Sequence, residues 1–405
     1  MSGATTVYAY ELLTPETAAD YLRSHSELAD LVDPDQELDV HEVGDGNLNL
    51  IFVVADGRQS LVLKQALPYV RMVGPSWPLT PERATAEARA LEAHSRVAPE
   101  YVPAFYGFDR ERYVLAIEDL SSHRVWRGAL NDGEQHPAAA AAMGRYIARI
   151  AFGTSLFGVE AKELKRLTAD AINPWLCEIT ENLVFTEPYV DTERNWFQPE
   201  LLPDVDELRA DTRFVSAIGE LKYAFMTQAE ALVHGDLHTG SVMVLPEGST
   251  RAIDSEFAYY GPVGFDISCL WGNYLFALAR ARVSDQTELA EWVRGLARET
   301  WDAFEQEFRS LWPGRVDPRV FTDSFLERWL AKVHADAVGM TAAELCRRTL
   351  GLAHVSDIET LAEPERERAV RGLLRTARRL APARAEIRSP DELVAVADEL
   401  IGGAL

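Results

Sequence analysis

The sequence predicts an α+β protein with two lobes, a small N-terminal lobe built on an antiparallel sheet and a larger, mainly helical C-terminal lobe. Short apolar segments separated by turn residues fill residues 38–117, whereas helical spacing of apolar residues dominates after Ser121. A chain of 405 residues is long enough for two lobes with a core each. We therefore expect an N-terminal lobe of residues 1–120 and a C-terminal lobe of residues 121–405.

The composition, 47% hydrophobic and 26% charged, is that of an ordinary globular protein. The formal net charge of -24 argues against nucleic acid or an anionic membrane surface as a partner. Any anionic ligand must then be held by a few locally placed cations, by backbone N–H groups or by a metal ion.

The three cysteines are widely spaced and lack metal-ligand spacing, so we expect buried apolar residues in a reducing cytoplasm: Cys177, Cys269 and Cys346. Residues 1–11 show no basic region followed by an apolar run, so no secretory signal is expected. The Ala-rich stretch from Ala138 is interrupted by Arg145 and Arg149, which argues against a membrane span.

The first elements follow from turn and cap residues. Thr14-Pro15 is typical of a helix start, and we expect a helix from there towards Leu31. Three strands should follow, over residues 38–43, 50–54 and 61–64, with a hairpin turn at Asp56-Gly57.

The glycine-containing turn between the first two of these strands is a candidate phosphate-binding loop. Backbone N–H groups of Gly44, Gly46 and Asn47 would approach the phosphates, and Lys64 on the third strand would supply a cation. Such hairpins are commonly only turns and strand lysines are usually solvated, so each feature alone is weak. Their order along the chain is the order that a kinase N-lobe requires.

Residues 65–80 contain Gly, Pro and Trp77 and are expected to form a loop, which is either a lid over a site or a surface loop whose Trp packs on the sheet. Thr80-Pro81 should cap a helix through Val97. Glu87 on that helix is the candidate partner of Lys64, with Glu82, Glu92 and a solvated helix face as alternatives.

Two further strands, 101–107 and 112–117, end at Glu118-Asp119-Leu120, which by pattern alone is a charged strand terminus. Residues 121–230 read mainly as helices, including 143–150, and the last of them should end near Ala231. The aromatic residues of this region are expected in the core, with some lining a substrate pocket: Trp175, Phe185, Tyr189 and Trp196.

The central feature is a polar loop between two apolar runs, in residues 232–244. Its segment from His234 to Ser241 fits the kinase pattern H-x-D-x-x-x-x-N, with Asp236 as the carboxylate beside an attacking hydroxyl. The Asn position holds Ser241, whose hydroxyl is a weaker metal ligand than an amide oxygen.

Downstream, Asp254-Ser255-Glu256 places two carboxylates one residue apart. On an extended segment both would project to the same side and bind one hard cation such as Mg²⁺. Either motif alone is equally well explained by an ordinary turn or a solvated strand end, but their joint order and spacing indicate phosphoryl transfer.

Two later features complete the candidate site. Asp266 either braces the catalytic loop or is a plain helix N-cap. Arg347 and Arg348 lie about 100° apart on a predicted helix and can point to one broad side. They would hold a developing phosphate or substrate hydroxyls, although surface arginine pairs are far commoner.

The runs at 234–241 and 254–262, with Gly-Asp-Gly-Asn-Leu-Asn at 44–49 and Arg-Arg-Thr-Leu-Gly-Leu-Ala-His at 347–354, closely resemble the 5-methylthioribose kinase family. That family belongs to the aminoglycoside-phosphotransferase and choline-kinase group. The resemblance implies the two-lobed protein-kinase-like fold, with ATP and Mg²⁺ as cofactors. It assigns the metal to Asp254 and Glu256 and the sugar to Asp236, Arg347 and Arg348. The nucleotide contacts that it implies are Asn47, Glu118, Asp119, Leu120, Asp254, Ser255 and Glu256.

The function that this resemblance implies is ATP-dependent phosphorylation of the 1-hydroxyl of S-methyl-5-thioribose in methionine salvage, by a cytoplasmic homodimer. Ser255 departs from the family pattern, which usually has proline between the two carboxylates. The alternatives are a kinase for another 5-modified ribose such as 5-deoxyribose, a kinase for an aminoglycoside-like alcohol, and a nucleotide-binding pseudokinase. The retained set Lys64, Asp236, Asp254 and Glu256 argues against the last.

Overall fold

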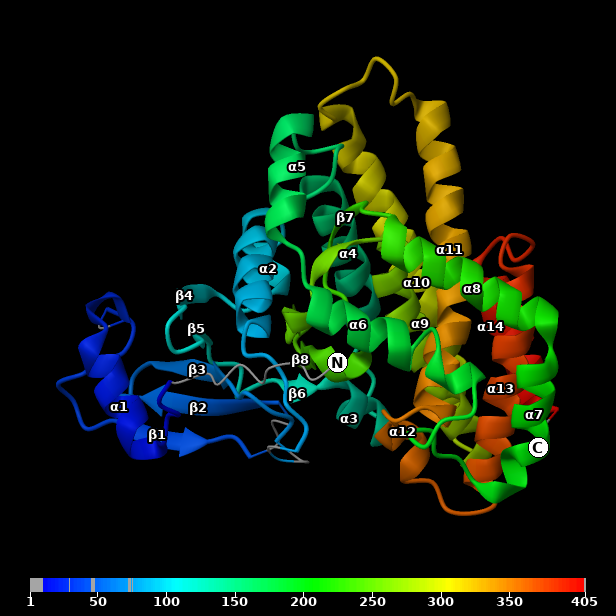
Figure 1. Ribbon diagram of the computed structural model, residues 1–405, viewed down its shortest axis with the longest axis horizontal. Helices are drawn as coiled ribbons and strands as arrows, with labels where there is room; N and C mark the ends of the chain where they lie inside the picture. The colour runs from blue at the N-terminus through cyan, green and yellow to red at the C-terminus, as the bar shows by residue number, and fades with distance from the viewer. Residues whose placement is uncertain (1–9, 29, 45–47, 72–73, 75, 404–405) are drawn as a thin grey trace, which may run out of the picture. The chain divides into compact units, whose positions relative to one another are not determined.

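The computed structural model describes residues 10–28, 30–44, 48–71, 74 and 76–403. The chain divides into two compact units, an N-terminal unit of Met1–Ser122 and a C-terminal unit of His123–Leu405 (Figure 1). The N-terminal unit holds an antiparallel sheet and the C-terminal unit is mainly helical, so the predicted α+β fold class is confirmed.

The N-terminal unit is built on a five-stranded antiparallel sheet with the order β1-β2-β3-β5-β4. Its strands are β1 Asp39–Glu42, β2 Asn49–Ala55, β3 Ser60–Ala66, β4 Phe105–Asp109 and β5 Val114–Glu118. The predicted hairpin turn is confirmed: Gly57 has φ +82°, and the Asp56 carboxylate accepts the backbone N–H groups of Arg58 and Gln59. These backbone hydrogen bonds lower the pKa of Asp56 to about 2.

Helix α1, Pro15–Ser24, covers one face of this sheet. Thr14 caps it through a hydrogen bond to the Thr17 N–H, as the sequence predicts. The helix ends at Ser24 and a 3₁₀ turn, Ser26–Leu28, follows, so the expected continuation towards Leu31 is wrong. Its apolar side packs on alternate residues of the strands, in one core: Leu13, Ala18, Tyr21, Leu22, Phe52, Val54, Leu61, Leu63, Val114 and Ala116.

Helix α2, Arg83–Val97, packs against β3, β4 and β5. Side chains alternate along a strand, so Lys64 projects from β3 to the face opposite Leu63 and towards α2. The helix starts later than expected, because the Thr80 hydroxyl accepts the Glu82 N–H ahead of the first helical residue. The strand expected from Tyr101 also starts later, since Pro99–Tyr101 is a 3₁₀ turn.

The C-terminal unit is a helical assembly around α9, Val263–Val283, in which almost every side chain is buried. A helix that is apolar on all sides requires packing partners all round, and α4, α10, α11 and α13 supply them. The remaining bounds are α3 Trp126–Asn131, α4 Ala139–Gly153, α5 Ala161–Asp170, α6 Pro174–Leu183, α7 Leu202–Ala210, α8 Thr212–Thr227, α10 Thr287–Leu311, α11 Asp323–Leu350, α12 Ser356–Glu359, α13 Glu365–Ala383 and α14 Pro390–Gly402.

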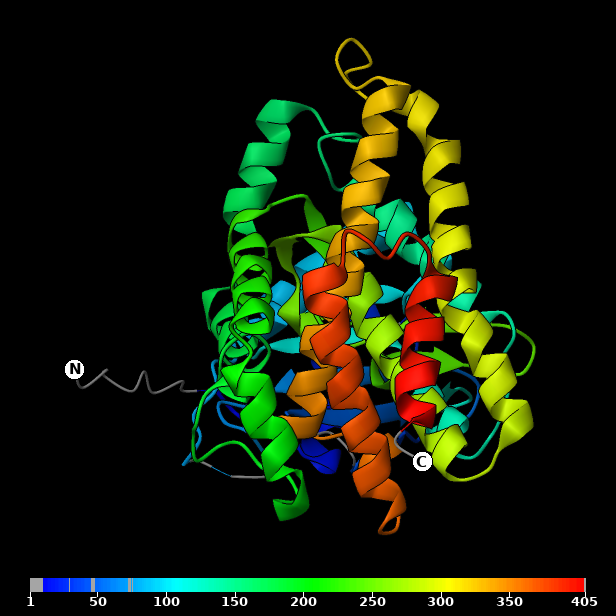
Figure 2. The ribbon, with the colours of Figure 1, turned by 90° about the vertical axis from the view of Figure 1, so that its right-hand side faces the viewer.

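Figure 2 shows α13 and α14 side by side on this unit. Two small antiparallel sheets carry the loops of the candidate site. One pairs β7, Ala231–Val233, with β10, Tyr259–Gly261. The other contains β6 Arg124–Val125, β8 Val242–Val244 and β9 Thr250–Ala252. The predicted helix over 143–150 is confirmed within α4, whereas α8 ends at Thr227 rather than near Ala231.

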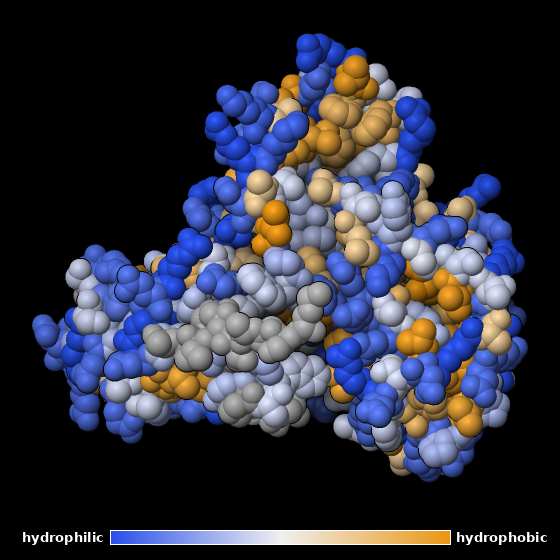
Figure 3. All heavy atoms as spheres, viewed as in Figure 1, coloured by the Kyte–Doolittle hydropathy of each residue, from blue (hydrophilic) through white to orange (hydrophobic). Residues whose placement is uncertain are grey.

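Some predicted core residues lie at the surface. Phe185 and Tyr189 are buried, but Trp175 and Trp196 are 51% and 50% exposed, so their assignment to the core is wrong. Figure 3 shows small hydrophobic areas, in orange, interspersed with hydrophilic residues on the C-terminal unit. Cys269 and Cys346 are buried as expected, whereas Cys177 is half-buried; all three are free thiols. Within the described ranges, no helix is long and apolar enough to cross a membrane.

Candidate active site

The candidate catalytic loop, residues 234–241, leaves β7 after Val233 and is held from two sides. The Asp266 carboxylate, on the first turn of α9, accepts the backbone N–H groups of His234 at 2.8 Å and Gly235 at 2.9 Å. The His234 ring nitrogen Nε2 lies 2.8 Å from the Ile253 carbonyl oxygen. Asp266 therefore braces the loop, and the alternative of a helix N-cap is wrong because Pro262 occupies that position.

Glycine is required at position 235. Its φ is +83°, and a Cβ there would lie 2.3 Å from the Phe257 carbonyl oxygen. The loop thus passes directly against the end of the Asp254–Glu256 motif. Burial raises the pKa of Asp266, whose two hydrogen bonds to the backbone compensate part of that cost.

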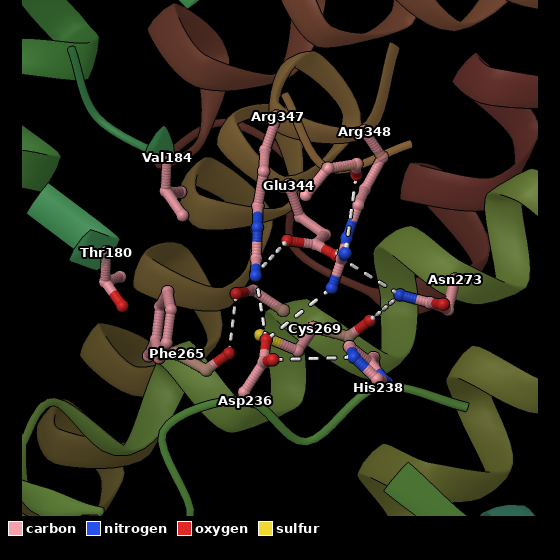
Figure 4. Close-up of polar contacts among 12 residues, drawn as sticks. Thr180, Val184, Asp236, His238, Phe265, Cys269, Asn273, Glu344, Arg347 and Arg348 are labelled. Atoms are coloured by element: carbon pink, nitrogen blue, oxygen red, sulfur yellow. Dashed lines mark hydrogen bonds and ion pairs between the residues drawn. The ribbon is translucent and has the colours of Figure 1, made fainter. Parts of the chain in front are cut away.

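The fixed loop presents Asp236 to the arginine pair of α11 (Figure 4). Arg347 Nη1 donates to Asp236 Oδ1 at 2.8 Å, and Arg348 Nη2 lies 3.6 Å from the same oxygen. His238 Nε2 lies 3.5 Å from Asp236 Oδ2. The structure therefore brings Asp236 together with the predicted arginine pair, which begins 111 positions later in the chain.

The electrostatics of this cluster keep Asp236 ionised. Burial acts to raise its pKa, but Arg347, His238 and Arg348 outweigh burial and hold the pKa well below its usual range. Burial lowers the pKa of His238 to about 4, with Arg127 and Arg348 acting in the same direction against Asp236. At neutral pH the loop thus contains a carboxylate next to a neutral imidazole.

A second carboxylate, Glu344, holds both arginines and was not singled out from the sequence. Its Oε1 accepts Arg348 Nε at 2.9 Å and its Oε2 accepts Arg347 Nη1 at 3.2 Å. Glu344 is 1% exposed, and the two arginines outweigh burial and lower its pKa. The spacing Glu-x-x-Arg-Arg is the available sequence signal, because residues three and four apart are neighbours on a helix. Arg347 Nε and Arg348 Nη2 are buried, and neither has a hydrogen-bond partner among the residues that the structure describes.

Three more polar residues, none of them singled out from the sequence, hold the catalytic loop. Asn273 Oδ1, on α9, accepts Arg127 Nη2 at 2.6 Å and the Thr239 hydroxyl at 3.1 Å. Arg127 Nε, on α3, lies 3.1 Å from Asp357 Oδ2 at the start of α12. The Arg127 side chain packs so closely on the loop that a Cβ at Gly240 would lie 2.7 Å from its Nη1. Asn273, Arg127 and Asp357 are single polar residues in three different helices, so no sequence motif points to any of them.

Ser241 stands where the kinase pattern has Asn. Its side chain is 3% exposed, and its hydroxyl lies 3.2 Å from Nδ1 of the His238 ring. This hydroxyl thus fixes the ring that faces Asp236.

The Asp254–Glu256 motif differs in conformation from the expectation. Asp254 has the left-handed backbone angles φ 63° and ψ 46°, and Ser255–Phe257 is a 3₁₀ turn, so the predicted extended segment is wrong. Asn173, just ahead of α6, donates through Nδ2 to the carbonyl oxygens of Glu256 at 2.9 Å and Ala258 at 3.2 Å. A non-glycine residue in the left-handed region costs energy that the surrounding structure must supply, and such residues cluster at functional sites.

The donor set of this turn fits a magnesium ion that also takes water and phosphate ligands. In the part of the chain that the structure describes, no three His, Cys, Asp or Glu residues form a group able to hold a metal ion. Mg²⁺ commonly binds through only one or two carboxylates and completes its shell with water and substrate phosphates. The buried Ser255 hydroxyl, between the two carboxylate residues, has no hydrogen-bond partner in the described part of the chain.

In the N-terminal unit, Lys64 Nζ lies 2.6 Å from Glu87 Oε1, and both side chains are 3% exposed. This confirms Glu87 as the partner of Lys64. The alternatives are engaged elsewhere, Glu82 with the Tyr113 hydroxyl and Glu92 with Arg96. Gly44 lies exposed in a turn with open space around it, whereas Gly46 and Asn47 fall outside the described residues.

The residues assigned to the nucleotide at the end of β5 have local roles in the structure. Glu118 Oε2 accepts the Ala104 N–H at 3.0 Å. The Asp119 carboxylate accepts the Ser60 hydroxyl at 2.6 Å and the Ser121 N–H at 2.9 Å. Leu120 is 7% exposed. These contacts fix the course of the chain there, and nucleotide binding at these residues stays a prediction.

The loop that follows β3 returns on itself. Val70 N–H donates to the Trp77 carbonyl at 3.0 Å, and Leu79 N–H donates to the Pro68 carbonyl at 3.1 Å. Trp77 is half-buried. The choice between a lid and a surface loop stays open on these contacts.

His334 should make the stability of the C-terminal unit depend on pH. Burial against Trp271 and Trp301 lowers its pKa from 6.5 to about 4. Between these two pH values His334 binds a proton in the unfolded chain but not in the folded chain. The free energy of unfolding therefore falls as the pH drops from about 6.5 to about 4. His334→Gln should make that slope shallower by about 1.4 kcal/mol per pH unit.

Urea unfolding followed by tryptophan fluorescence between pH 4.5 and 7.5 measures this slope. His41→Gln is the matched control, because His41 lies exposed on β1. Equal slopes for the wild type and His334→Gln would contradict the assignment.

The family model described as "Phosphotransferase enzyme family" matches residues 39–306. A methylthioribose kinase of Bacillus thuringiensis (strain Al Hakam) is 41% identical over 357 residues, covering 88% of each chain. One of Yersinia pseudotuberculosis serotype O:1b (strain IP 31758) is 42% identical over 369 residues, covering 89% of each. A solved choline/ethanolamine kinase family protein of Mesorhizobium loti aligns with a TM-score of 0.46 and 13% identity, covering 95% of this chain and 99% of that one. A chain with this sequence identity over nearly nine-tenths of its length belongs to the phosphotransferase enzyme family and, within it, to the methylthioribose kinases.

Proposed function

We propose that this protein transfers the γ-phosphoryl group of ATP to the 1-hydroxyl of S-methyl-5-thioribose, giving S-methyl-5-thioribose 1-phosphate in methionine salvage. The observation that carries the proposal is the 2.8 Å ion pair between Asp236, on a braced loop, and Arg347, in a chain from the methylthioribose kinase family. A carboxylate beside an arginine fork is suited to hold a sugar hydroxyl and the charge that develops on transfer.

Asp236 orients the 1-hydroxyl of the sugar and receives its proton late in the reaction. Its low pKa makes it a weak base, which suffices because phosphoryl transfer passes through a loose transition state with little need for early deprotonation. The brace from Asp266 and the neutral His238 ring keep the carboxylate in place while the hydroxyl binds.

Arg347 and Arg348 bind the sugar hydroxyls and stabilise the negative charge that builds up on the transferred group. Two of their donors, Arg347 Nε and Arg348 Nη2, are buried without a hydrogen-bond partner among the described residues and can donate to a hydroxyl oxygen. A neutral polyol fits this cluster because its cations and carboxylates balance: Arg127, Arg347 and Arg348 against Asp236, Glu344 and Asp357. A polycationic aminoglycoside would require an excess of carboxylates there.

ATP is bound by Lys64 and the turn that contains Gly44, Gly46 and Asn47, and its remaining contacts are Glu118, Asp119, Leu120 and Ser255. Asp254 and Glu256 hold Mg²⁺, with the free Ser255 hydroxyl available beside them. When bound, the ion neutralises charge on the phosphate oxygens. The Lys64–Glu87 pair keeps the ammonium group extended for the phosphates.

The protein acts in the cytoplasm on small molecules, as a homodimer without a nucleic-acid or membrane partner. The net charge of -24 supports the exclusion of polyanionic partners, and the family resemblance supports the dimer.

A coupled ADP-release assay with ATP and Mg²⁺ tests the function on a panel of methylthioribose, 5-deoxyribose, ribose, choline and an aminoglycoside. We expect the highest kcat/KM with methylthioribose. A preference for 5-deoxyribose would move the substrate assignment to another 5-modified ribose. ATP binding without turnover of any acceptor would contradict the proposal in favour of the pseudokinase.

A further inference from the structure

Arg83, the first residue of α2, is a fully buried cation that the sequence analysis did not single out. It is 1% exposed, and among the described residues of the N-terminal unit its guanidinium donates to four acceptors. Nη1 donates to the carbonyl oxygens of Leu67 at 2.7 Å and Thr80 at 2.8 Å. Nη2 donates to the Leu48 carbonyl and to Asn49 Oδ1 at 3.0 Å.

These four acceptors lie at the ends of two segments with predicted roles in nucleotide binding. Leu48 and Asn49 are the last two residues of the 44–49 turn assigned to the phosphates, and Asn49 is also the first residue of β2. Leu67 and Thr80 are the two ends of the loop that follows β3. Leu67 N–H also donates to the Leu48 carbonyl at 3.4 Å, so the segments meet at Arg83.

Arg83 and Glu87 share one face of α2. Residues four apart on a helix lie one above the other, and Glu87 pairs with Lys64 on β3. A single helix face therefore fastens the end of the phosphate turn, both ends of the following loop and the lysine. The planar fork of arginine, with its fixed donor directions, suits this task better than the point charge of lysine.

We propose that Arg83 is a positioning residue for ATP, which sets the distance between the phosphate turn and Lys64 by fastening the chain at Leu48, Asn49, Leu67 and Thr80. The inference rests on the proposed binding of ATP phosphates by the 44–49 turn and Lys64. It adds a residue that does not touch the nucleotide and acts through the backbone that does.

Arg83→Met retains most of the side-chain length and removes all four hydrogen bonds. We expect the Kd for ATP, measured by titration calorimetry without sugar, to rise about tenfold, which corresponds to about 1.4 kcal/mol. Arg83→Lys should give a smaller rise, because an ammonium reaches only some of the four acceptors. In steady-state assays the KM for ATP should rise while the KM for the sugar at saturating ATP stays unchanged.

Arg96→Met is the matched control, because Arg96 lies on the same helix with its side chain 69% exposed. If Arg83→Met fails to fold, Arg83→Lys and Asn49→Ala, which removes one acceptor, carry the same test. A folded Arg83 variant with wild-type affinity for ATP would overturn the proposal, as would equal rises in both KM values. Since ATP binding is measured without sugar, its result is independent of the identity of the acceptor.

Discussion

Asp236→Asn is expected to lower kcat by about 10²–10⁴-fold, the range that a positioned proton acceptor contributes. Asparagine keeps the shape of the side chain and can still accept the hydrogen bond from Arg347, so the loop should stay folded. It cannot take the proton of the sugar hydroxyl. The KM for ATP should change little, and the coupled ADP-release assay at saturating methylthioribose measures the loss.

Asp191→Asn is the control for this experiment, because Asp191 is an exposed carboxylate of the same unit. Its kcat should equal that of the wild type. Near-normal turnover by folded Asp236→Asn would refute the role given to Asp236, and another carboxylate would have to accept the proton.

Arg347→Met is expected to lower kcat/KM for the sugar by about 10–100-fold, because it removes a charge-assisted hydrogen bond of about 1.5–3 kcal/mol. It should also change the pH profile. Arg347 is the largest of the influences that lower the pKa of Asp236, so its removal raises that pKa. Activity needs the ionised carboxylate, which is present above its pKa, and the acid limb of the variant must therefore lie at higher pH than that of the wild type.

The pH dependence of kcat/KM, measured for the wild type and the variant, separates this electrostatic effect from a loss of substrate contacts. Arg328→Met is the matched control, because Arg328 is exposed on the same helix, α11. An unchanged sugar KM and kcat in folded Arg347→Met would place the sugar site elsewhere.

Local features of the fold could be predicted because neighbouring residues suffice to determine them. Thr14 caps α1, Asp56-Gly57 turns a hairpin, and the loop containing His234 and Asp236 sits between two short strands. Glu87 was also predicted as the partner of Lys64, with Glu82 and Glu92 as alternatives, because a helix glutamate pairs with the strand lysine in protein kinases.

The burial of the aromatic side chains could not be predicted with the same success. Trp175 and Trp196 are aromatic residues of the same region as Phe185 and Tyr189, yet about half of each tryptophan is exposed to solvent. Periodicity shows that a helix has an apolar side, but the neighbouring helices decide which aromatic residues that side covers.

The order of the motifs, the α+β class and the family, through residues 234–241 and 254–262, could be predicted from the residues alone. The contacts that these residues make depended on how distant elements pack. The tertiary structure paired Asp236 with an arginine 111 positions away, gave Glu344 and Asn273 their roles, placed Asp254 in a left-handed turn and buried Arg83 between two loops. The physical reason is that hydrogen-bond partners and pKa shifts depend on which groups share a buried volume. That volume is formed by helices and strands that are distant in the chain.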